Sequence, residues 1–381
     1  MRQLTTALVL VLALSLLVLG SCSLRTRTGH LDEAVGLPTL EVLAAISDTR
    51  PGNVAVTPQG RVIITNHPLD SPTWRAAELL PDGTKRPFPN LDWADGPATG
   101  DVGLSSTIGI AADTRGVVWI LDMGSDDAPP QLVGWDTVGD RLHARLPIPP
   151  EVTRPISFLQ DFALDEKRRK VYIADMTFPA PGAPAQPAIV ILDLNTGEGR
   201  RVLERSAPLM PSESEVIIDG SVVGTVTEQG RSHPWRLGIN PIAIDPSFEW
   251  VYFATINGDR VHRIPAAELA ESSRTRDELE AAIETYGPKP PCDGIAVDAH
   301  GRVFITDIQS SAVGVTTPGR YEILVQERRL LSWPDGFALG PDGTLHVTQN
   351  HLHAHPALNE GVDETTRPFH VVKLRPPTPS R

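Results

Sequence analysis

The chain has 381 residues, of which 36 are proline and 31 are glycine, and 40% of its residues are hydrophobic. This composition is sufficient for a large folded core and differs from that of a disordered chain. The formal net charge of −13 argues against nucleic-acid binding and against a basic surface that would bind membranes.

The first 21 residues have the pattern of an export signal. Arg2 precedes the apolar run "ALVLVLALSLLVL" at residues 7–19, and this run is shorter than the roughly 20 residues of a membrane-spanning helix. It leads into "LGSC", which resembles a bacterial lipobox, where small residues precede a cysteine that accepts a diacylglyceryl group. We predict a signal peptide at residues 1–21, a lipid anchor at Cys22 and a linker over residues 22–44.

This interpretation predicts an exported cell-envelope lipoprotein on the periplasmic or surface side, with membrane contact through the anchor alone. An ordinary secretory peptide, with Cys22 incidental, is the alternative. Once Cys22 is lipidated, Cys292 is the one thiol left in the sequence. Neither a disulfide framework nor a cysteine metal site can then form within the chain.

Six copies of one hairpin pattern follow along the chain, aligned on an alanine within an apolar stretch. Each copy is a strand, a turn rich in Asp, Gly, Pro or Arg, and a second β-branched strand. Strand-like runs between the copies bring each repeat to about four strands. The pattern predicts an all-β fold, a six-bladed β-propeller over residues 45–376, with a C-terminal tail at residues 377–381. The copies lie at residues 52–66, 108–122, 160–175, 240–255, 293–307 and 335–349.

Two insertions interrupt the regular spacing of the repeats. The segment "ERSAPLMPSESEVIIDGSVV" (residues 204–223) predicts an extra loop and hairpin over one face. Residues 275–286 predict one short inserted helix, because Thr275 and Glu278 have the spacing of a capping box and Gly287 follows as a stop signal. We expect the apolar stripe of this helix to pack on its blade.

Several of these stretches together resemble the yellow / major royal jelly protein family, and in particular its bacterial lipoprotein-type members. They include "SFLQDFALDEKRRKVYIADM", "GINPIAIDPSFEWVYFATINGDRVHRIP", "CDGIAVDAHGRVFITDIQ" and "WPDGFALGPDGTLHVTQNHLHAHPALN". The resemblance covers nearly all of residues 45–376. It implies a six-bladed propeller related at a distance to gluconolactonase-like calcium lactonases. It does not imply one activity, because the family includes ligand-binding, storage and signalling proteins.

In a propeller, the residues at the start of the inner strands converge from all blades on one channel mouth. Three positions before the aligned alanines, the first two blades offer Gly52 and Ile108. The next four blades offer oxygen donors, which suit a hard cation such as Ca²⁺. We therefore predict a metal or ligand site, with Ca²⁺ as the expected cofactor, formed by Gln160, Asn240, Asp293 and Asp335.

The resembling lactonases place an Asn and an Asp at the positions of Asn240 and Asp293. They take a further glutamate ligand from the first blade, where this chain has Gly52, and this difference weakens the lactonase assignment. In the alternative interpretation, Asp293 and Asp335 accept backbone N–H groups before the glycine of an Asp-Gly turn. Asp161, beside Gln160, could face the channel mouth or cap its own turn.

A second aligned set of polar residues closes the inner hairpins, and we expect it to bond to the backbone of the next blade. It consists of Asn66, Asp122, Asp175, Thr255, Asp307 and Gln349. In "HLHAH", His351, His353 and His355 alternate, so a transition-metal site through imidazole nitrogen is one interpretation. A loop with one histidine at the mouth is the other, and His353 is the candidate because it matches a histidine in the resembling bacterial sequences. His67 is a weaker candidate.

Two functional hypotheses follow from these residues. In the first, the protein is a cell-envelope propeller that binds a small polar ligand or a partner protein at the channel mouth, without turnover. In the second, it is a gluconolactonase-like hydrolase or isomerase, in which Ca²⁺ polarises a carbonyl and Asp335 or His353 is the catalytic acid or base. The sequence contains no nucleophile elbow, phosphate loop or zincin motif.

Overall fold

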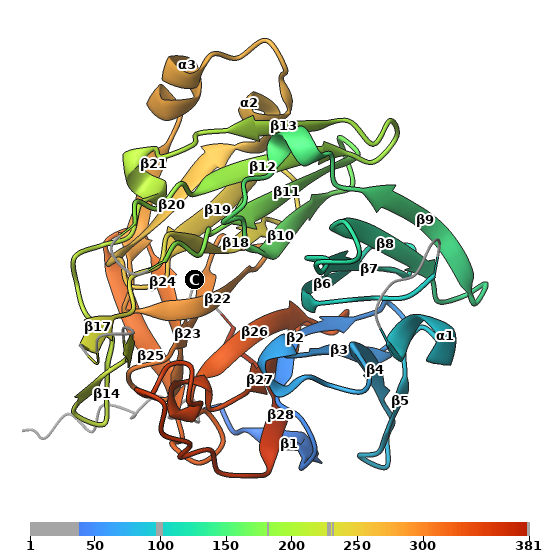
Figure 1. Cartoon of the computed structure of the whole chain (residues 1–381), viewed down its shortest axis with the longest axis vertical. Coiled ribbons are helices and arrows are strands. Elements are labelled where there is room, and N and C mark those ends of the chain that lie inside the picture. The colour runs from blue at the N-terminus through green and yellow to red at the C-terminus, as the bar shows by residue number, and fades with distance from the viewer. Residues whose placement is uncertain (1–37, 97–101, 181–182, 227–229, 231, 379–381) are drawn as a thin grey trace, which may run out of the picture. The chain divides into compact units, whose positions relative to one another are not determined.

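The computed structural model describes residues 38–96, 102–180, 183–226, 230 and 232–378. Six antiparallel four-stranded sheets stand around a central axis (Figure 1). The protein is thus the six-bladed β-propeller that the repeats predict. In each sheet the strands follow one another outward from the axis, and sheets of neighbouring blades pack face to face.

The first three blades follow one another along the chain. The first consists of β2 (Pro51–Val56), β3 (Val62–Asn66), β4 (Ala76–Leu79) and β5 (Lys85–Pro87). The second consists of β6 (Thr107–Ala112), β7 (Val117–Asp122), β8 (Gln131–Asp136) and β9 (Arg141–Pro147). The third consists of β10 (Leu159–Asp165), β11 (Lys170–Asp175), β12 (Ala188–Asp193) and β13 (Gly199–Val202).

The last three blades include the one that closes the ring. The fourth consists of β18 (Ile239–Ile244), β19 (Trp250–Thr255), β20 (Arg260–Pro265) and β21 (Glu284–Pro288). The fifth consists of β22 (Cys292–Val297), β23 (Val303–Asp307), β24 (Ala312–Thr317) and β25 (Arg320–Gln326). The sixth consists of β26 (Pro334–Leu339), β27 (Leu345–Gln349), β28 (Phe369–Leu374) and β1 (Glu41–Ile46).

Strand β1 closes the propeller, because it comes from the beginning of the chain and pairs with the last strand, β28. Its residues include positions that the sequence suggested were linker, so the described propeller begins before residue 45. The inner strands contact one another around the whole ring, in the order β2, β6, β10, β18, β22, β26 and back to β2. This pairing joins the first described strand to the last blade and so closes the ring of blades.

Each inner strand leaves the regular ladder near its start. In all six blades the pairing of the inner strand with the next strand is irregular at this point, for example between Cys292 and Ile295 in β22. The positions three before the aligned alanines lie in these irregular steps. Such bulges redirect side chains and are frequent next to functional sites, so the residues there turn toward the channel mouth.

Buried threonine hydroxyls link adjacent blades at the bulges. Thr65 Oγ1 in the first blade accepts a backbone N–H of its own blade at 2.9 Å and donates to the Ile108 carbonyl of the second blade at 2.7 Å. Thr348 Oγ1 in the sixth blade likewise donates to the Gly52 carbonyl of the first blade at 2.6 Å. These bonds satisfy backbone groups that the bulges free from the ladder.

The core lies between the blades. One cluster joins Tyr172 of the third blade to Ile242 and Phe253 of the fourth. Another joins Tyr252 of the fourth blade to Cys292 of the fifth, where the thiol is fully buried. Alternating strand residues supply these contacts because successive side chains point to opposite faces of a sheet.

Three short helices are present in the described part of the chain, where the sequence predicted one. They are α1 (Leu91–Ala94), α2 (Ala266–Ala270) and α3 (Arg276–Ala281). The predicted capping box is present at α3, with Thr275 as the N-cap. The helix ends earlier than residue 286, because β21 begins at Glu284 and pairs with β20. No helix among the described residues is long and apolar enough to cross a membrane.

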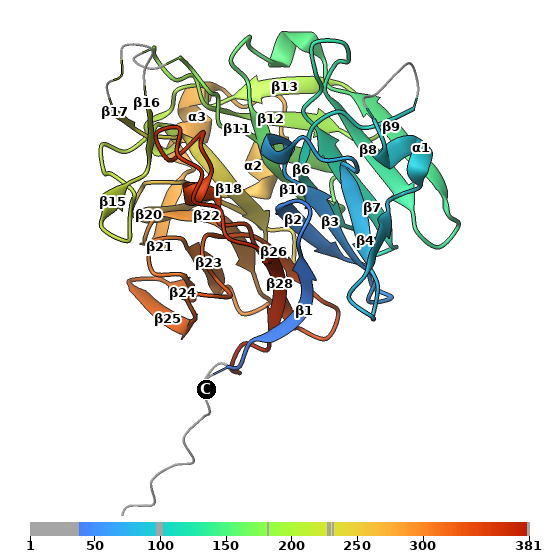
Figure 2. The same cartoon turned by 60° about the horizontal axis from the view of Figure 1, so that its bottom comes forward.

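Loops and short hairpins border the channel mouth on one side, and we define them as the cap, which consists of the described residues among 206–238 and 350–366 (Figure 2). The first part contains η3 (Ala207–Leu209) and the hairpins β14 (Ile217–Ile218)–β15 (Ser221–Val222) and β16 (Gly224–Val226)–β17 (Ser232–Pro234). The predicted hairpin in the insertion is thereby confirmed. The second part contains η4 (Leu352–Ala354). Leu352 and Leu358 pack against Val223 of the first part in one apolar cluster. Two further 3₁₀ turns are η1 (Pro68–Asp70) and η2 (Pro150–Val152).

The substitution Thr65→Val tests the hydroxyl links between blades. It keeps the shape of the side chain but leaves two buried backbone groups, the Asn53 N–H and the Ile108 carbonyl, without a partner. We expect the free energy of unfolding to fall by about 1–3 kcal/mol in chemical denaturation. Thr196→Val, in an exposed turn, should change it by less than about 0.5 kcal/mol. Equal effects of the two substitutions would contradict the role of Thr65.

Candidate functional site

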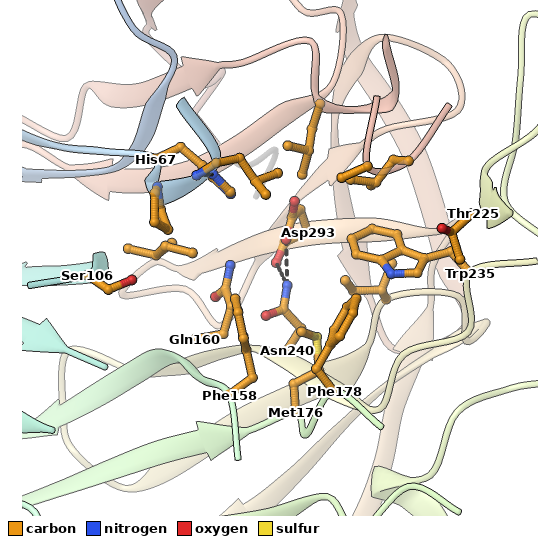
Figure 3. A pocket seen from close by; sticks show the side chains of 17 residues that line it. His67, Ser106, Phe158, Gln160, Met176, Phe178, Thr225, Trp235, Asn240 and Asp293 are labelled. Atoms are coloured by element: carbon orange, nitrogen blue, oxygen red, sulfur yellow. Dashed lines mark hydrogen bonds between the residues drawn. The ribbon is translucent and has the colours of Figure 1, made fainter. Parts of the chain in front are cut away.

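A cavity of about 540 Å³ lies at the channel mouth, bordered by the cap and by the starts of the inner strands. We call it the mouth pocket (Figure 3). Its walls are mostly apolar, and they include Phe158, Met176, Phe178, Trp235, Ile256 and Leu358. Its polar side chains are few, and most lie at its floor. A largely apolar cavity with a few convergent polar groups is the usual form of a small-molecule site.

Three of the four predicted oxygen donors meet at the floor of the mouth pocket. Gln160, Asn240 and Asp293 all line it, from the third, fourth and fifth blades (Figure 3). Asp335 does not line the pocket, although it occupies the same position in the sixth blade. Its side chain is buried and accepts a hydrogen bond from Asn350 Nδ2.

Asp293 is held by two side-chain donors. Asn240 Nδ2 donates to its Oδ1, and Trp333 Nε1 donates to its Oδ2 at 2.7 Å. Asn240 Nδ2 also donates to the Asp293 carbonyl at 3.1 Å. The Asn240 Oδ1 atom, by contrast, is buried without a hydrogen-bond partner among the described residues. An orphaned acceptor of this kind requires an explanation, and a ligand in the pocket would supply one.

The Asp-Gly sequences at Asp293 and Asp335 do not form turns. Both acids lie in inner strands, and their carboxylates accept side-chain amide or indole N–H groups rather than the backbone. The following glycines serve close packing between blades. A Cβ at Gly294 would lie 2.1 Å from the Asp335 carbonyl oxygen, and one at Gly336 would lie 2.0 Å from Asn53 Oδ1. The alternative interpretation of these acids is therefore wrong.

His67 is a floor residue that the sequence ranked only as a weak candidate. Its ring is buried and lines the mouth pocket (Figure 3). Nδ1 accepts the Leu69 N–H at 3.2 Å, which places the ring proton on Nε2. Burial and the neighbouring Arg50 lower the pKa of His67 to about 3. The imidazole is thus neutral at physiological pH and can donate from Nε2.

His353 lies outside the mouth pocket. Its ring stacks on Trp333, with centroids 6.0 Å apart and planes at 16°, and it lines a second, smaller cavity together with His351. The sequence placed Asp335 or His353 beside a bound substrate as acid or base. Neither side chain borders the mouth pocket, so the structure does not bring this predicted pair to the site.

An aromatic wall is the part of the site that the repeats did not reveal. Ring centroids lie 6.0 Å apart for Phe158 and Phe178, 6.4 Å for Phe178 and Trp235, and 6.0 Å for Trp235 and Trp333. Trp235 comes from the cap and Phe178 from the loop after β11, so neither belongs to an aligned position. Phe178 is half exposed, with 50% of its surface accessible, at the pocket entrance.

The residues that close the inner hairpins do not join neighbouring blades as predicted. Each acid of this set instead bonds within its own blade, where its inner hairpin meets the outer strands. The contacts are those of Asp122 with Gln131 at 3.0 Å, Asp175 with Arg201 at 2.6 Å and Asp307 with Tyr321 at 2.9 Å. The threonine hydroxyls described above make the links between blades.

The comparisons with known proteins agree with this architecture. The family model of the major royal jelly proteins matches residues 105–338. The chain belongs to this family. No curated protein matches its sequence.

Solved structures similar to this royal jelly-type propeller share its fold at low identity. A gluconolactonase from Xanthomonas campestris is 12% identical, with a TM-score of 0.54, over 89% of this chain and 90% of that chain. A luciferin-regenerating enzyme is 13% identical, with a TM-score of 0.53, over 88% and 95%. A PQQ-bound aldose sugar dehydrogenase from Streptomyces coelicolor is 11% identical, with a TM-score of 0.52, over 89% and 98%. These likenesses establish the fold alone.

The first-blade position of this royal jelly-type propeller is closed to a larger side chain. A Cβ at Gly52 would lie 2.7 Å from Thr65 Oγ1, and that hydroxyl is fixed by its bonds to two backbone groups. The glutamate that the resembling lactonases have in the first blade therefore has no room here. No group of three or more His, Cys, Asp or Glu side chains in the described part of the chain is arranged to hold a metal ion.

Three buried carboxyl groups lie near the axis, and of these Asp293 lines the pocket. Burial raises the pKa of Asp161 to about 8 and that of Asp293 to about 6. Burial and the charges of these two acids raise the pKa of Asp335 well above its usual value. Asp161 accepts the Phe162 N–H at 2.9 Å and Asn53 Nδ2 at 3.4 Å, so it serves the packing of the inner strands.

The substitution Asp335→Asn tests this cluster. The pKa of the Asp335 carboxyl in the folded protein lies above its value of about 3.9 in the unfolded chain. Its contribution to the free energy of unfolding is therefore complete below pH 3.9, and it is lost as the pH rises through the folded pKa. Asparagine can keep the bond from Asn350 and removes the charge. The variant and the wild type should be equally stable near pH 4, and the variant should become progressively more stable than the wild type as the pH rises above that value.

Chemical denaturation at a series of pH values measures this difference. Buried histidines such as His67 titrate in the same range with the opposite sign, but they are common to both proteins and cancel in the comparison. Glu360→Gln, at an exposed position, is the matched control and should follow the wild type. A stability difference for Asp335→Asn that does not depend on pH would show that the pKa of Asp335 is not raised in the folded protein.

Proposed function

We propose that this protein binds a small amphipathic molecule in the mouth pocket while a lipid at Cys22 anchors it to the cell envelope. One observation carries the proposal: a cavity of about 540 Å³ combines an aromatic wall with a floor whose acceptor Asn240 Oδ1 is buried and unpartnered. The sequence predicted a small polar ligand. The apolar walls of the pocket favour a ligand that also has an apolar part, because burying apolar surface of the ligand against them is favourable.

The floor favours a ligand head that donates hydrogen bonds. Asn240 Oδ1 and the Asp293 carboxylate are acceptors, and with a pKa of about 6 Asp293 is mostly ionised at pH 7. A carboxylate head would meet like charge in a buried site. Trp235 Nε1 on the wall is buried without a partner among the described residues, and His67 Nε2 on the floor carries a proton, so these two groups offer donors to an acceptor on the ligand body.

A panel of compounds with one aromatic body and an amine, hydroxyl or carboxylate head tests this proposal. We expect the amine and the hydroxyl compounds to bind and to quench tryptophan fluorescence, while the carboxylate does not bind. Phe178→Ala should weaken binding at least tenfold, which is about 1.4 kcal/mol. Leu142→Ala, an exposed apolar residue on the outer strand β9, is the control. Equal binding of all three heads, or no effect of Phe178→Ala, would contradict the proposal.

A calcium ion on the same floor is a second candidate occupant. Gln160, Asn240 and Asp293 offer oxygen atoms, but Ca²⁺ takes six to eight oxygen ligands, so water or the ligand would complete the sphere. When bound, the ion would polarise a carbonyl of the ligand. The hydrolase alternative has less support, because Asp335 and His353 do not border the pocket and Gly52 replaces the first-blade acid.

Calorimetry with Ca²⁺ and a panel of lactones separates binding from turnover. We expect weak Ca²⁺ binding, with a dissociation constant of about 10⁻⁴–10⁻³ M, and no lactone hydrolysis. Asn240→Leu should abolish the calcium signal, and Asp335→Asn should keep it, because Asp335 lies outside the pocket. If the protein hydrolyses a lactone and EDTA abolishes this hydrolysis, the hydrolase hypothesis would replace the proposed binding function.

The lipid anchor concerns residues outside the described part of the chain. Its support is the lipobox-like "LGSC" ending at Cys22. In cells, Cys22→Ser should abolish fatty-acid labelling and move the protein from the membrane fraction to the soluble fraction. Unchanged labelling would refute the anchor without affecting the proposal for the pocket.

A further inference from the structure

Two carboxamide side chains lie next to each other on the floor of the mouth pocket. Gln160 comes from β10 and Asn240 from β18, which are the contacting inner strands of adjacent blades, and both side chains line the cavity. Figure 3 shows the two amide groups side by side. The exposed fraction is 7% for Gln160 and 0% for Asn240. A buried pair of amides can recognise a ligand by its pattern of donors and acceptors.

The fold determines which end of the Asn240 amide is left for a ligand. Its Nδ2 donates to the Asp293 carbonyl at 3.1 Å and also to Asp293 Oδ1. Both partners are acceptors, so the reverse orientation of the amide would place Oδ1 against two oxygen atoms. Oδ1 points away from them, toward the side of Gln160 (Figure 3), and it is buried without a partner among the described residues. A donor on the ligand would satisfy this acceptor.

The Gln160 amide, by contrast, is not bonded to the protein. Neither Nε2 nor Oε1 makes a hydrogen bond to another of the described residues. Nε2 is therefore a donor that is available beside the Asn240 acceptor. Each carboxamide has a donor end and an acceptor end, and the neighbouring pair offers one of each to the cavity. This arrangement is complementary to a ligand that carries an N–H group next to a C=O group.

The aromatic wall determines the kind of body that carries this edge. Phe158, Phe178 and Trp235 line the same cavity as the two amides. Their neighbouring ring centroids lie 6.0 Å and 6.4 Å apart. Aromatic side chains favour a flat ring that stacks on them or meets their edges. A cavity of about 540 Å³ has room for a fused ring system of two rings.

We propose that the mouth pocket recognises a planar heteroaromatic lactam, whose ring N–H donates to Asn240 Oδ1 and whose adjacent C=O accepts from Gln160 Nε2. Such a lactam is neutral, so it avoids the like charge that a carboxylate would meet beside Asp293. Its donor and acceptor lie in the plane of the ring, so the ring can stack on the wall while its edge faces the floor. The inference rests on the proposed function, because it requires the mouth pocket to be a binding site.

Calorimetry of the full chain with 2-quinolone and N-methyl-2-quinolone tests this inference. Both compounds have the same two fused rings and the same carbonyl, and the methyl group removes the N–H donor. We expect 2-quinolone to bind at least tenfold more tightly, because the methylated compound leaves Asn240 Oδ1 buried and unsatisfied. The control for size is 4-methyl-2-quinolone, which adds a methyl group but keeps the N–H, and it should bind like 2-quinolone.

Two substitutions assign the two ends of the lactam edge. Asn240→Leu should weaken the binding of 2-quinolone at least tenfold and remove its advantage over the N-methyl compound. Gln160→Met keeps the length of the side chain and removes the donor, so it should weaken both compounds by the same factor. Gln59→Met, at an exposed turn, is the matched control and should bind like the wild type. Thermal unfolding shows whether the variants fold, and the comparison of compounds on the wild type does not depend on them.

The outcomes separate this inference from the proposed function. Equal affinity of the wild type for 2-quinolone and its N-methyl derivative would overturn the lactam inference, as would equal losses for the N-methyl and 4-methyl compounds or unchanged binding in a folded Gln160→Met variant. If the amphipathic compounds described above still bind, the proposed function stands. If no compound of either set binds, the proposed function and this inference are both wrong.

Discussion

The irregular step at the start of each inner strand is the constraint on which the mouth of this propeller depends. At this step the strand leaves its ladder, and a side chain that would otherwise lie between blades turns toward the axis. The freed backbone groups need other partners, and buried hydroxyls such as those of Thr65 and Thr348 supply them from the adjacent blade. The same feature thus closes the ring and opens a set of positions to ligands.

The residues at these bulges also make the floor of the mouth pocket different from blade to blade. Blades one and two place Gly52 and Ile108 at the mouth, whereas the next blades place polar side chains there. The cap enters the chain between the third and fourth blades and brings Trp235 over this polar side. An apolar wall therefore stands beside the unsatisfied acceptor Asn240 Oδ1. That combination favours a molecule with two chemically different ends over a uniformly polar one.

Among the described residues, no cation bonds to the three buried carboxyl groups near the axis. Asp161, Asp293 and Asp335 are buried, and the groups that bond to them are amide and indole N–H donors rather than cations. Burial without a counter-ion favours the protonated form. The charge of the floor is then set by pH and by whatever donor or cation occupies the pocket, which makes binding and protonation linked events.

The periodic part of the sequence predicted the periodic part of the structure. Six aligned hairpins were sufficient to predict the number of blades. The aligned positions were sufficient to predict that Asn240 and Asp293 lie close together, and the two side chains are hydrogen-bonded. The prediction failed where residues outside the repeat decide the contacts. Asp335 has the aligned position but turns to Asn350, and the aromatic residues Phe178 and Trp235 lie in segments without an aligned counterpart. Long-range packing of the cap, which no local pattern encodes, decides these contacts.

Trp333 connects the floor of the mouth pocket to the cap. Its indole N–H fixes Asp293 on the floor of the mouth pocket, and its ring stacks on His353 of the cap. Its φ of 52° is rare for a bulky side chain, and backbone strain of this kind costs about 1–3 kcal/mol. The surrounding contacts must hold the residue in place. A displacement of His353 would therefore reach Asp293 through one rigid ring, so the cap and the floor of the mouth pocket share a structural element.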